Sequence, residues 1–212
     1  MSKKYIVLDF EGVVFKPRLR EMYVDIFKQT GRDLSEMDYF FEKIFKEKYR
    51  SENCRDKSIS DMINHIVSKY PDWEQELRAF EAHNQFDRFV DEVIVGMDKV
   101  VEYFTLSDKY ELYGLTNWTA DGFEVLESKF SNIVSKFKEV LVSGKVGVKK
   151  PDYKIWVLAN EMMGNPNPED VYFFDDKQRN VDRAREEVNW NSYLFTQVDD
   201  IFAVFPDVAS NV

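Results

Sequence analysis

A single cysteine, Cys54, occurs among the 212 residues, so no disulfide can form within the chain. We therefore expect a reducing compartment, and a cytoplasmic location. Cys54 stands in the polar stretch RSENCRDKS, and we interpret it as incidental rather than as a nucleophile. Histidine is also scarce. His65 and His83 have no partners at the spacing of metal ligands, so we interpret both as ordinary residues.

Positive charge and long hydrophobic runs are in short supply as well. The net charge of -10 argues against a nucleic-acid partner, which needs a basic face, and against an anionic membrane surface. No apolar run approaches the ~18 residues of a membrane span. The first residues, MSKKYIVLDF, run straight from a short apolar stretch into charges, so we expect no signal peptide. The composition predicts a globular protein of one large domain, or a domain with an insertion.

From about residue 96 to the end, short apolar runs alternate with helical patterns. The runs are YELYGL (110–115), EVLVS (139–143), VYFF (171–174) and SYLF (192–195), and residues 5–8 form a similar run near the start. The segments between them repeat apolar residues at helical spacing, for example at Phe123, Leu126 and Phe130, and Gly164 is placed to end one such helix. Fully apolar strands alternating with helices predict a parallel sheet covered on both faces.

The middle of the chain, roughly residues 16–93, shows no convincing strand. Apolar residues follow helical spacing from Met37 to Tyr49 and from Ile59 to Tyr70, and the second helix follows a capping box formed by Ser58 and Asp61. The sequence therefore predicts an α/β fold. Its Rossmann-like parallel-sheet core spans residues 1–15 and 94–212, and an all-helical insertion spans residues 16–93.

Polar residues follow the predicted strands, at the edge where ligands bind in such sheets. These strand ends are Asp9-Phe10-Glu11-Gly12, Thr116-Asn117-Trp118, Lys149-Lys150-Pro151 and Asp175-Asp176. A buried carboxylate is costly unless something pairs with it. Several acids at one edge indicate a hard cation with oxygen ligands, most simply Mg²⁺. A lysine and a hydroxyl beside that cation indicate an anionic substrate, most simply a phosphate ester.

Four motifs in this order, LDFEGVV, LTNW, VKKP and FFDDKQRN, resemble those of the haloacid dehalogenase-like (HAD) hydrolase superfamily. The insertion is similar in size and pattern to the helical cap of its cap-bearing phosphatase branch, and YGLTNWTADGF is particularly close to that branch. The resemblance implies an Mg²⁺-dependent hydrolase of a small phosphorylated metabolite, such as a sugar phosphate or a nucleotide. We expect a monomer or a weak homodimer.

The resemblance also implies roles for the residues of the first two motifs. Asp9 would be the nucleophile that forms an aspartyl-phosphate. Glu11 would be the acid/base residue, and its backbone carbonyl would be a metal ligand. Thr116 would donate its hydroxyl to the phosphoryl oxygens, together with the backbone N–H of Asn117.

The last two motifs would supply charge. The resemblance implies that Lys150 neutralises the growing negative charge and restrains Asp9. Asp176 would bind Mg²⁺ together with Asp9. Asp175 would be either a further metal ligand or a partner of one, and Asn180 would orient these groups.

Glu11 departs from the family pattern, which usually has Asp at this position. Its extra methylene moves the carboxyl by more than ~1 Å, and a misplacement on that scale costs up to ~10²-fold in rate. Three alternatives follow: a fully active phosphatase, a slow one, or a non-catalytic protein that binds phosphorylated ligands. A 2-haloacid dehalogenase is less favoured, because that branch works without Mg²⁺ and does not need an acid at Glu11.

Several neighbouring residues have a plainer interpretation. Lys149 is expected to be a solvated neighbour of Lys150, and Trp118 either lines the substrate pocket or only packs. Lys16, Arg18 and Arg20 follow the first motif, where the chain leaves the core for the insertion. They either meet an anionic substrate or form a solvated hinge, and we favour the hinge.

Overall fold

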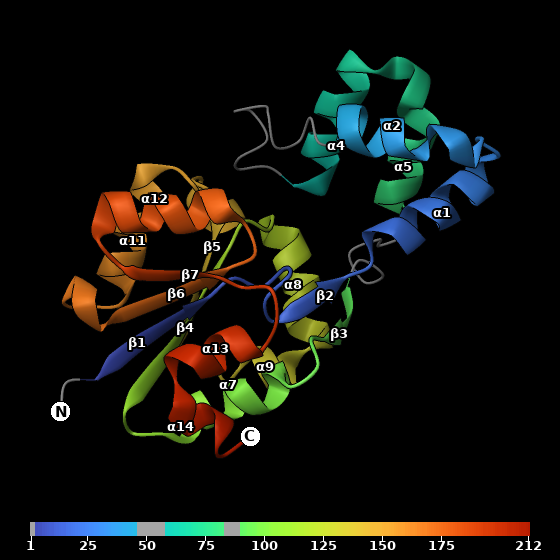
Figure 1. Ribbon diagram of the computed structural model, residues 1–212. Coiled ribbons are helices and arrows are strands. Elements are labelled where there is room, and N and C mark those ends of the chain that lie inside the picture. Colours follow the sequence, from blue (N-terminus) through green and yellow to red (C-terminus); the bar gives the residue numbers. More distant parts are fainter. Residues whose placement is uncertain (1–2, 46–57, 83–89) are drawn as a thin grey trace.

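The computed structural model describes residues 3–45, 58–82 and 90–212 (Figure 1). Tyr49, Cys54 and His83, which the sequence analysis mentioned, lie outside these residues. None of the described helices has the length and apolar character needed to cross a membrane.

The core is a five-stranded parallel sheet, as predicted. Its strand order is β5-β4-β1-β6-β7, and β1 pairs with β4 on one side and with β6 on the other. The order of strands along the chain therefore reverses between β1 and β6, and ligand sites in such sheets lie at that point. The strands are β1 (Lys4–Leu8), β4 (Tyr110–Thr116), β5 (Glu139–Val142), β6 (Val171–Asp175) and β7 (Asn191–Leu194).

Helices cover both faces of this sheet (Figure 1). On one face α11 (Tyr153–Met162) and α12 (Gln178–Val188) pack with Val7 and Phe173 in a single apolar cluster. The other face is covered by α7 (Met97–Leu106), α13 (Asp199–Val204) and α14 (Pro206–Ala209). Successive strand residues point to opposite faces, so a sheet buried on both sides needs continuous apolar runs. This is why the strands could be found from the sequence.

Three further helices lie next to β5 in the chain. Helices α8 (Ala120–Lys129) and α9 (Ser131–Val134) connect β4 to β5, and α10 (Ser143–Val146) follows β5. A 3₁₀ turn at Pro168–Asp170 leads into β6.

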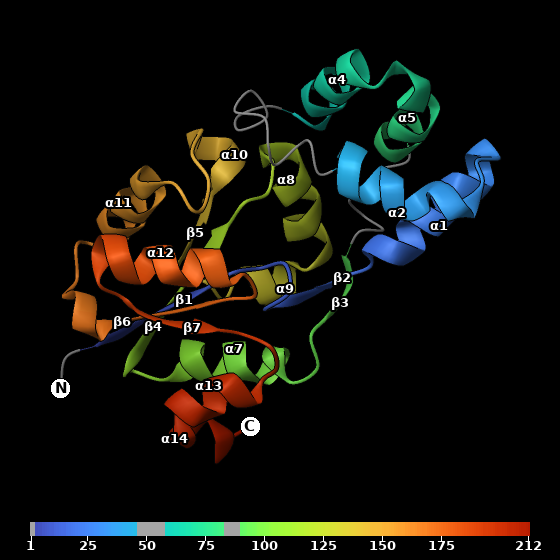
Figure 2. The same cartoon turned by 45° about the horizontal axis from the view of Figure 1, so that its top comes forward.

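The described part of the insertion forms a helical body apart from the sheet (Figure 2). Its helices are α1 (Leu19–Thr30), α2 (Met37–Tyr39), a π-helix (Phe40–Phe45), α4 (Ile59–Lys69) and α5 (Glu74–Ala82), with 3₁₀ turns at Leu34–Glu36 and Pro71–Trp73. The predicted cap of α4 is confirmed, because Ser58 Oγ accepts a hydrogen bond from the Asp61 N–H at 3.2 Å. The Ile59 N–H donates to Asp121 Oδ2 of α8 at 2.9 Å, which joins the insertion to the core.

The prediction that residues 16–93 contain no strand is wrong at both ends of this segment. Strands β2 (Phe15–Pro17) and β3 (Val90–Val93) pair antiparallel where the chain leaves and re-enters the core. Strands of three and four residues leave no readable alternation in the sequence, and their pairing joins segments more than 70 residues apart. Exposed ion pairs flank the pairing, including Lys16–Glu92 at 2.7 Å and Arg18–Asp91. The hinge role of these residues stays a prediction.

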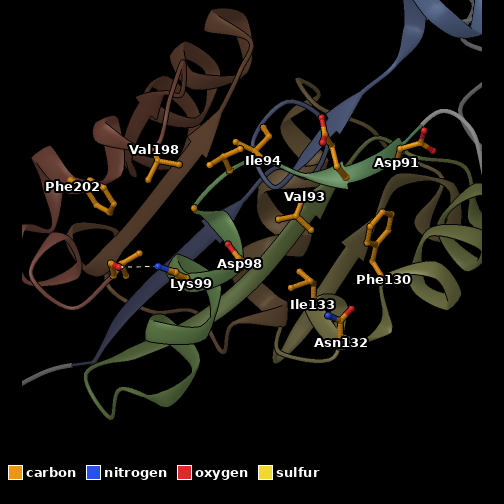
Figure 3. Close-up of a pocket in the computed structure, with 14 residues that line it drawn as sticks. Asp91, Val93, Ile94, Asp98, Lys99, Phe130, Asn132, Ile133, Val198 and Phe202 are labelled. Atoms are coloured by element: carbon orange, nitrogen blue, oxygen red, sulfur yellow. Dashed lines mark hydrogen bonds between the residues drawn. The ribbon is translucent and has the colours of Figure 1, made fainter.

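A groove of about 830 Å³ lies between β3, the start of α7 and α13 (Figure 3). Apolar side chains such as Val93, Ile133 and Phe202 line it, and Lys99 Nζ donates to the Val212 carbonyl at 3.3 Å at one end. Among the described residues that line it there is none of the predicted site residues, so it is separate from the carboxylate cluster described next.

Candidate active site

The site is built around Asp9, which directly follows β1. Its charged neighbours are Asp175, the last residue of β6, and Lys150, in the loop before α11. Lys150 Nζ lies 2.9 Å from Asp9 Oδ1 and 2.7 Å from Asp175 Oδ2, and it also donates to the Leu115 carbonyl at 2.7 Å. Lys150, Asp9 and Asp175 are all buried. An ammonium and two carboxylates buried together are stable only because each charge has a partner.

Asp175 is held from several sides. Its Oδ1 accepts from the Lys177 N–H at 2.9 Å and from the Asn180 side-chain amide at 2.9 Å. Its Oδ2 accepts from Lys150 and, at 3.0 Å, from Asn180. These hydrogen bonds fix the Asp175 carboxylate against Lys150. The Asn180 amide orients the Asp175 carboxylate, in line with the orienting role that the resemblance implies for Asn180.

The end of β4 contributes two further groups. The Asn117 side chain accepts from the Lys150 N–H at 2.8 Å and donates to the Lys150 carbonyl at 2.9 Å, so it fixes the backbone that carries the lysine. Thr116 is fully buried, and its Oγ1 has no hydrogen-bond partner among the described residues. A buried hydroxyl without a partner costs about 1–3 kcal/mol. Such a group is suited to a ligand that would donate or accept that bond.

The loop after Asp9 is a tight turn built around Phe10. The Phe10 carbonyl accepts from the N–H groups of Val14 (3.0 Å) and Phe15 (2.8 Å), and its ring packs against Phe123 and Phe137. Gly12 has φ +84°, and a Cβ placed there would lie 2.7 Å from Asp176 Oδ2. Only glycine lets the turn approach this carboxylate so closely.

Burial and charge shift the pKa values of the three acids. Burial raises the pKa of Asp9 to about 7, although the positive charge of Lys150 lowers it. The charges of Asp175 and Asp176 add to the rise. Burial also favours a higher pKa for Asp175, but Lys150 and the hydrogen bonds outweigh it and lower the pKa. The pKa of Asp176 is raised, mainly by burial, although the Lys177 charge opposes this.

Oxygens of Asp9, Asp175 and Asp176 lie within 4.8 Å of one another, close enough to hold a metal ion. A set of carboxylate oxygens suits a hard divalent cation. The raised pKa of Asp9 fits the same conclusion, because a bound cation would offset the cost of burying this carboxylate. The unpartnered Thr116 hydroxyl would gain from an anionic ligand beside the cation.

The structure thus brings together Asp9, Thr116, Asn117, Lys150, Asp175 and Asp176. Glu11 lies in the turn that follows Asp9, and its charge adds to the rise in the pKa of Asp176. Trp118 is buried in the apolar core, which favours packing over lining a pocket. Sequence reasoning missed Lys177, whose Nζ lies 3.2 Å from Asp176 Oδ1. Its place next to the double acid was the only available signal.

The fold and the arrangement of these residues define an α/β protein with the fold of HAD hydrolases, which confirms the resemblance at the level of the fold. The chain is similar to a HAD family enzyme from Bacteroides thetaiotaomicron: the TM-score is 0.72 at 17% identity, over 97% of this chain and 99% of that one. The wild-type form of that enzyme has been solved in complex with magnesium and inorganic phosphate.

The same fold occurs in a protein of different chemistry. The L-2-haloacid dehalogenase of Xanthobacter autotrophicus, solved with chloropropionic acid covalently bound, is 12% identical with a TM-score of 0.64, over 90% of this chain and 76% of that one. Fold similarity at such identities does not choose between phosphate and halide chemistry.

Sequence comparison adds one relative. The chain is 34% identical over 90 residues to the drimenol cyclase drtB of Aspergillus calidoustus, a match that spans 42% of this chain and only 16% of that protein. No known family model matches the chain.

Proposed function

We propose that the chain is an Mg²⁺-dependent hydrolase of small phosphate monoesters. The observation that carries this proposal is the buried cluster in which Lys150 bridges Asp9 and Asp175, together with the unpartnered hydroxyl of Thr116 at the end of β4. The cluster combines a restrained carboxylate, a cation and an open donor, which are the parts that phosphoryl transfer to a carboxylate needs. The complex of the Bacteroides enzyme with magnesium and phosphate supports the same assignment.

The proposed metal ligands are Asp9, Asp176 and the backbone carbonyl of Glu11. Asp175 was predicted to be either a metal ligand or a partner of one. Its hydrogen bonds support a different role, the anchor of Lys150, which in turn restrains the proposed ligand Asp9. When bound, Mg²⁺ supplies positive charge that offsets the repulsion between a carboxylate and the phosphoryl oxygens.

The chain's own residues would then carry two steps. In the first, Asp9 attacks phosphorus while the bond to the leaving oxygen breaks, and Glu11 gives that oxygen a proton. In the second, Glu11 takes a proton from water, which attacks the aspartyl-phosphate and releases phosphate and free Asp9. Thr116 would donate to a phosphoryl oxygen, and Lys150 would hold the Asp9 carboxylate in line throughout.

The test is phosphate release from a panel of small phosphate esters with Mg²⁺, using wild type, Asp9→Asn and Glu11→Asp side by side. We expect release by the wild type that is lost with a chelator and in Asp9→Asn. Activity in Glu11→Asp alone would instead mean that the glutamate has detuned the site and that the wild type binds phosphorylated ligands without turnover. Halide release from 2-halo acids without metal, with all phosphate assays silent, would replace the proposal with dehalogenation.

A further inference from the structure

The Lys150 ammonium donates its hydrogen bonds to oxygens of the protein. An ammonium has three donors, and the three contacts of Lys150 Nζ are Asp9 Oδ1, Asp175 Oδ2 and the Leu115 carbonyl, all within 2.9 Å. Turning the ammonium toward a substrate would leave the buried Asp175 carboxylate with one partner fewer. Lys150 can therefore act on a substrate through its charge, but its N–H groups already point to protein oxygens.

A second lysine stands on the open side of the cluster. Lys177 precedes α12, its Nζ lies 3.2 Å from Asp176 Oδ1, and its side chain is 38% exposed. Its backbone N–H donates to Asp175, so the residue is fixed at the site by its main chain while its side chain reaches the partly open carboxylate. The start of α12, a helix of 11 residues, adds partial positive charge at the same place.

The formal charges of the site residues indicate a role for Lys177. Fully ionised, the site holds four carboxylates (Asp9, Glu11, Asp175 and Asp176) against two ammonium groups (Lys150 and Lys177), a net charge of -2. A divalent cation brings this sum to zero, and a phosphate ester then adds two negative charges. Without Lys177 the loaded site would already be negative before the substrate arrived.

We propose that Lys177 is a specificity-determining residue that binds the phosphate group of the substrate once Asp176 serves the divalent cation. The inference rests on the proposed function and deepens it, since it assigns the contact with the anion to a residue of the fourth motif to which the resemblance gives no role. In this proposal the cation would bind the Asp176 carboxylate in place of Lys177. The Lys177 ammonium would then donate to a phosphoryl oxygen of the substrate.

The test compares Lys177→Met with Lys154→Met, an exposed lysine in the first turn of α11 whose loss changes the net charge equally. Calorimetry measures the binding of Mg²⁺ alone, and then of inorganic phosphate to the Mg²⁺-loaded protein. We expect Lys177→Met to weaken phosphate binding at least tenfold while Mg²⁺ binding stays equal or tightens. Lys154→Met should change neither by more than twofold, and Lys177→Arg should restore most of the phosphate affinity.

Three results would overturn the inference. They are wild-type phosphate affinity in Lys177→Met, a loss confined to Mg²⁺ binding, or no phosphate binding by the loaded wild-type protein. With an active ester, Lys177→Met should raise KM at least tenfold and change kcat much less. A wild-type protein that binds Mg²⁺ and phosphate but releases none from esters would contradict the proposed hydrolysis alone, because calorimetry still decides the role of Lys177.

Discussion

Two groups of buried charges, one in the core and one in the insertion, are built for different purposes. In the insertion, Arg32 meets Glu76 through two hydrogen bonds of 3.2 and 3.1 Å. The guanidinium also donates to the Asp72 carbonyl at 2.7 Å and stacks over Trp73, 4.1 Å from the ring centroid. The hydrogen bond to Glu76 raises the pKa of Arg32, so the guanidinium stays charged at any ordinary pH.

The core cluster is not balanced in this way. One buried ammonium, Lys150, serves both Asp9 and Asp175, and Asp176 adds a further acid. The pKa of Asp9 rises to about 7 as a result of its burial, and Thr116 keeps a buried hydroxyl without a partner. An ion pair whose two charges balance stabilises the fold. A cluster with excess negative charge and an unpartnered hydroxyl is suited to binding ligands. Four experiments can break or sharpen this contrast.

The largest expected effect is on activity in Asp9→Asn. We expect a loss of at least ~10⁴-fold, because the amide cannot serve as the nucleophile. The same variant should be as stable as the metal-free wild type, or more stable. Asp9 has a pKa of about 7 in the folded protein against an ordinary 3.8, so the wild type loses stability as the pH rises from 3.8 to about 7. Asp9→Asn does not undergo this loss, so its stability relative to the wild type should be greatest above pH 7.

Thermal unfolding of both proteins without metal, at pH 5 and pH 8, measures this second effect. The melting temperature of Asp9→Asn relative to wild type should be higher at pH 8 than at pH 5. A fall of several degrees at pH 8 would show that Asp9 is a structural partner of Lys150, like Glu76 for Arg32.

The next largest effect is on stability in the insertion. Glu76→Ala should lower the free energy of unfolding by about 3 kcal/mol, the low end for a broken buried pair, because Arg32 remains 25% exposed to water. Activity per folded molecule should be retained. Urea unfolding followed by circular dichroism measures the change.

The matched control is Glu74→Ala, which removes an exposed partner of Arg78 at 3.3 Å. Its cost should stay below about 1 kcal/mol. Equal costs for the two variants would mean that burial does not distinguish the Arg32–Glu76 pair.

A third experiment tests the close approach of the loop to the core cluster. Gly12→Ala should weaken Mg²⁺ binding at least ~10-fold, because a Cβ there would lie 2.7 Å from Asp176 Oδ2 and displace this carboxylate. Gly31→Ala is the control, since Gly31 has a similar φ of +74° and nothing within 4 Å of a Cβ. Both variants should lose about 1 kcal/mol of stability from strain, and calorimetry should show weaker Mg²⁺ binding only in Gly12→Ala. Unchanged Mg²⁺ affinity in Gly12→Ala would argue against Asp176 as a ligand.

The contrast between core and insertion also explains what the sequence could predict. The five core strands were found because a sheet buried on both faces requires continuous apolar runs, and Asp9, Thr116 and Asp175 were found because strand ends meet at one edge. Lys150 came with its motif. These features depend on local pattern and on a simple topology.

Features that depend on pairing between distant segments could not be predicted. The β2–β3 pairing joins residues 15–17 with 90–93, and each strand is too short to show a period. The hydrogen bonds between the Asn117 side chain and the Lys150 backbone likewise join residues 33 apart in the sequence. The ion pair of Lys177 with the adjacent Asp176 depends instead on side-chain orientation, which the sequence does not show. The π-helix at Phe40–Phe45 keeps apolar residues at a spacing that also fits an α-helix, so the sequence could not separate the two.

The smallest effect is the pH dependence of Mg²⁺ binding, and it tests directly whether the core cluster titrates. A metal ligand must be deprotonated, so Mg²⁺ competes with the proton on Asp9, whose pKa is raised to about 7. Affinity should rise with pH, by about fourfold between pH 6.5 and 8, and level off above that, because the carboxylate is then ionised without metal. Calorimetry in two buffers of different ionisation enthalpy should show close to one proton released per Mg²⁺ at pH 6 and almost none at pH 8. Asp9→Asn should bind more weakly and lose most of this dependence, whereas Glu76→Ala should keep it. Constant affinity from pH 6 to 8 in the wild type would mean that Lys150 keeps Asp9 ionised throughout, so that the core cluster is as closed electrostatically as the Arg32–Glu76 pair.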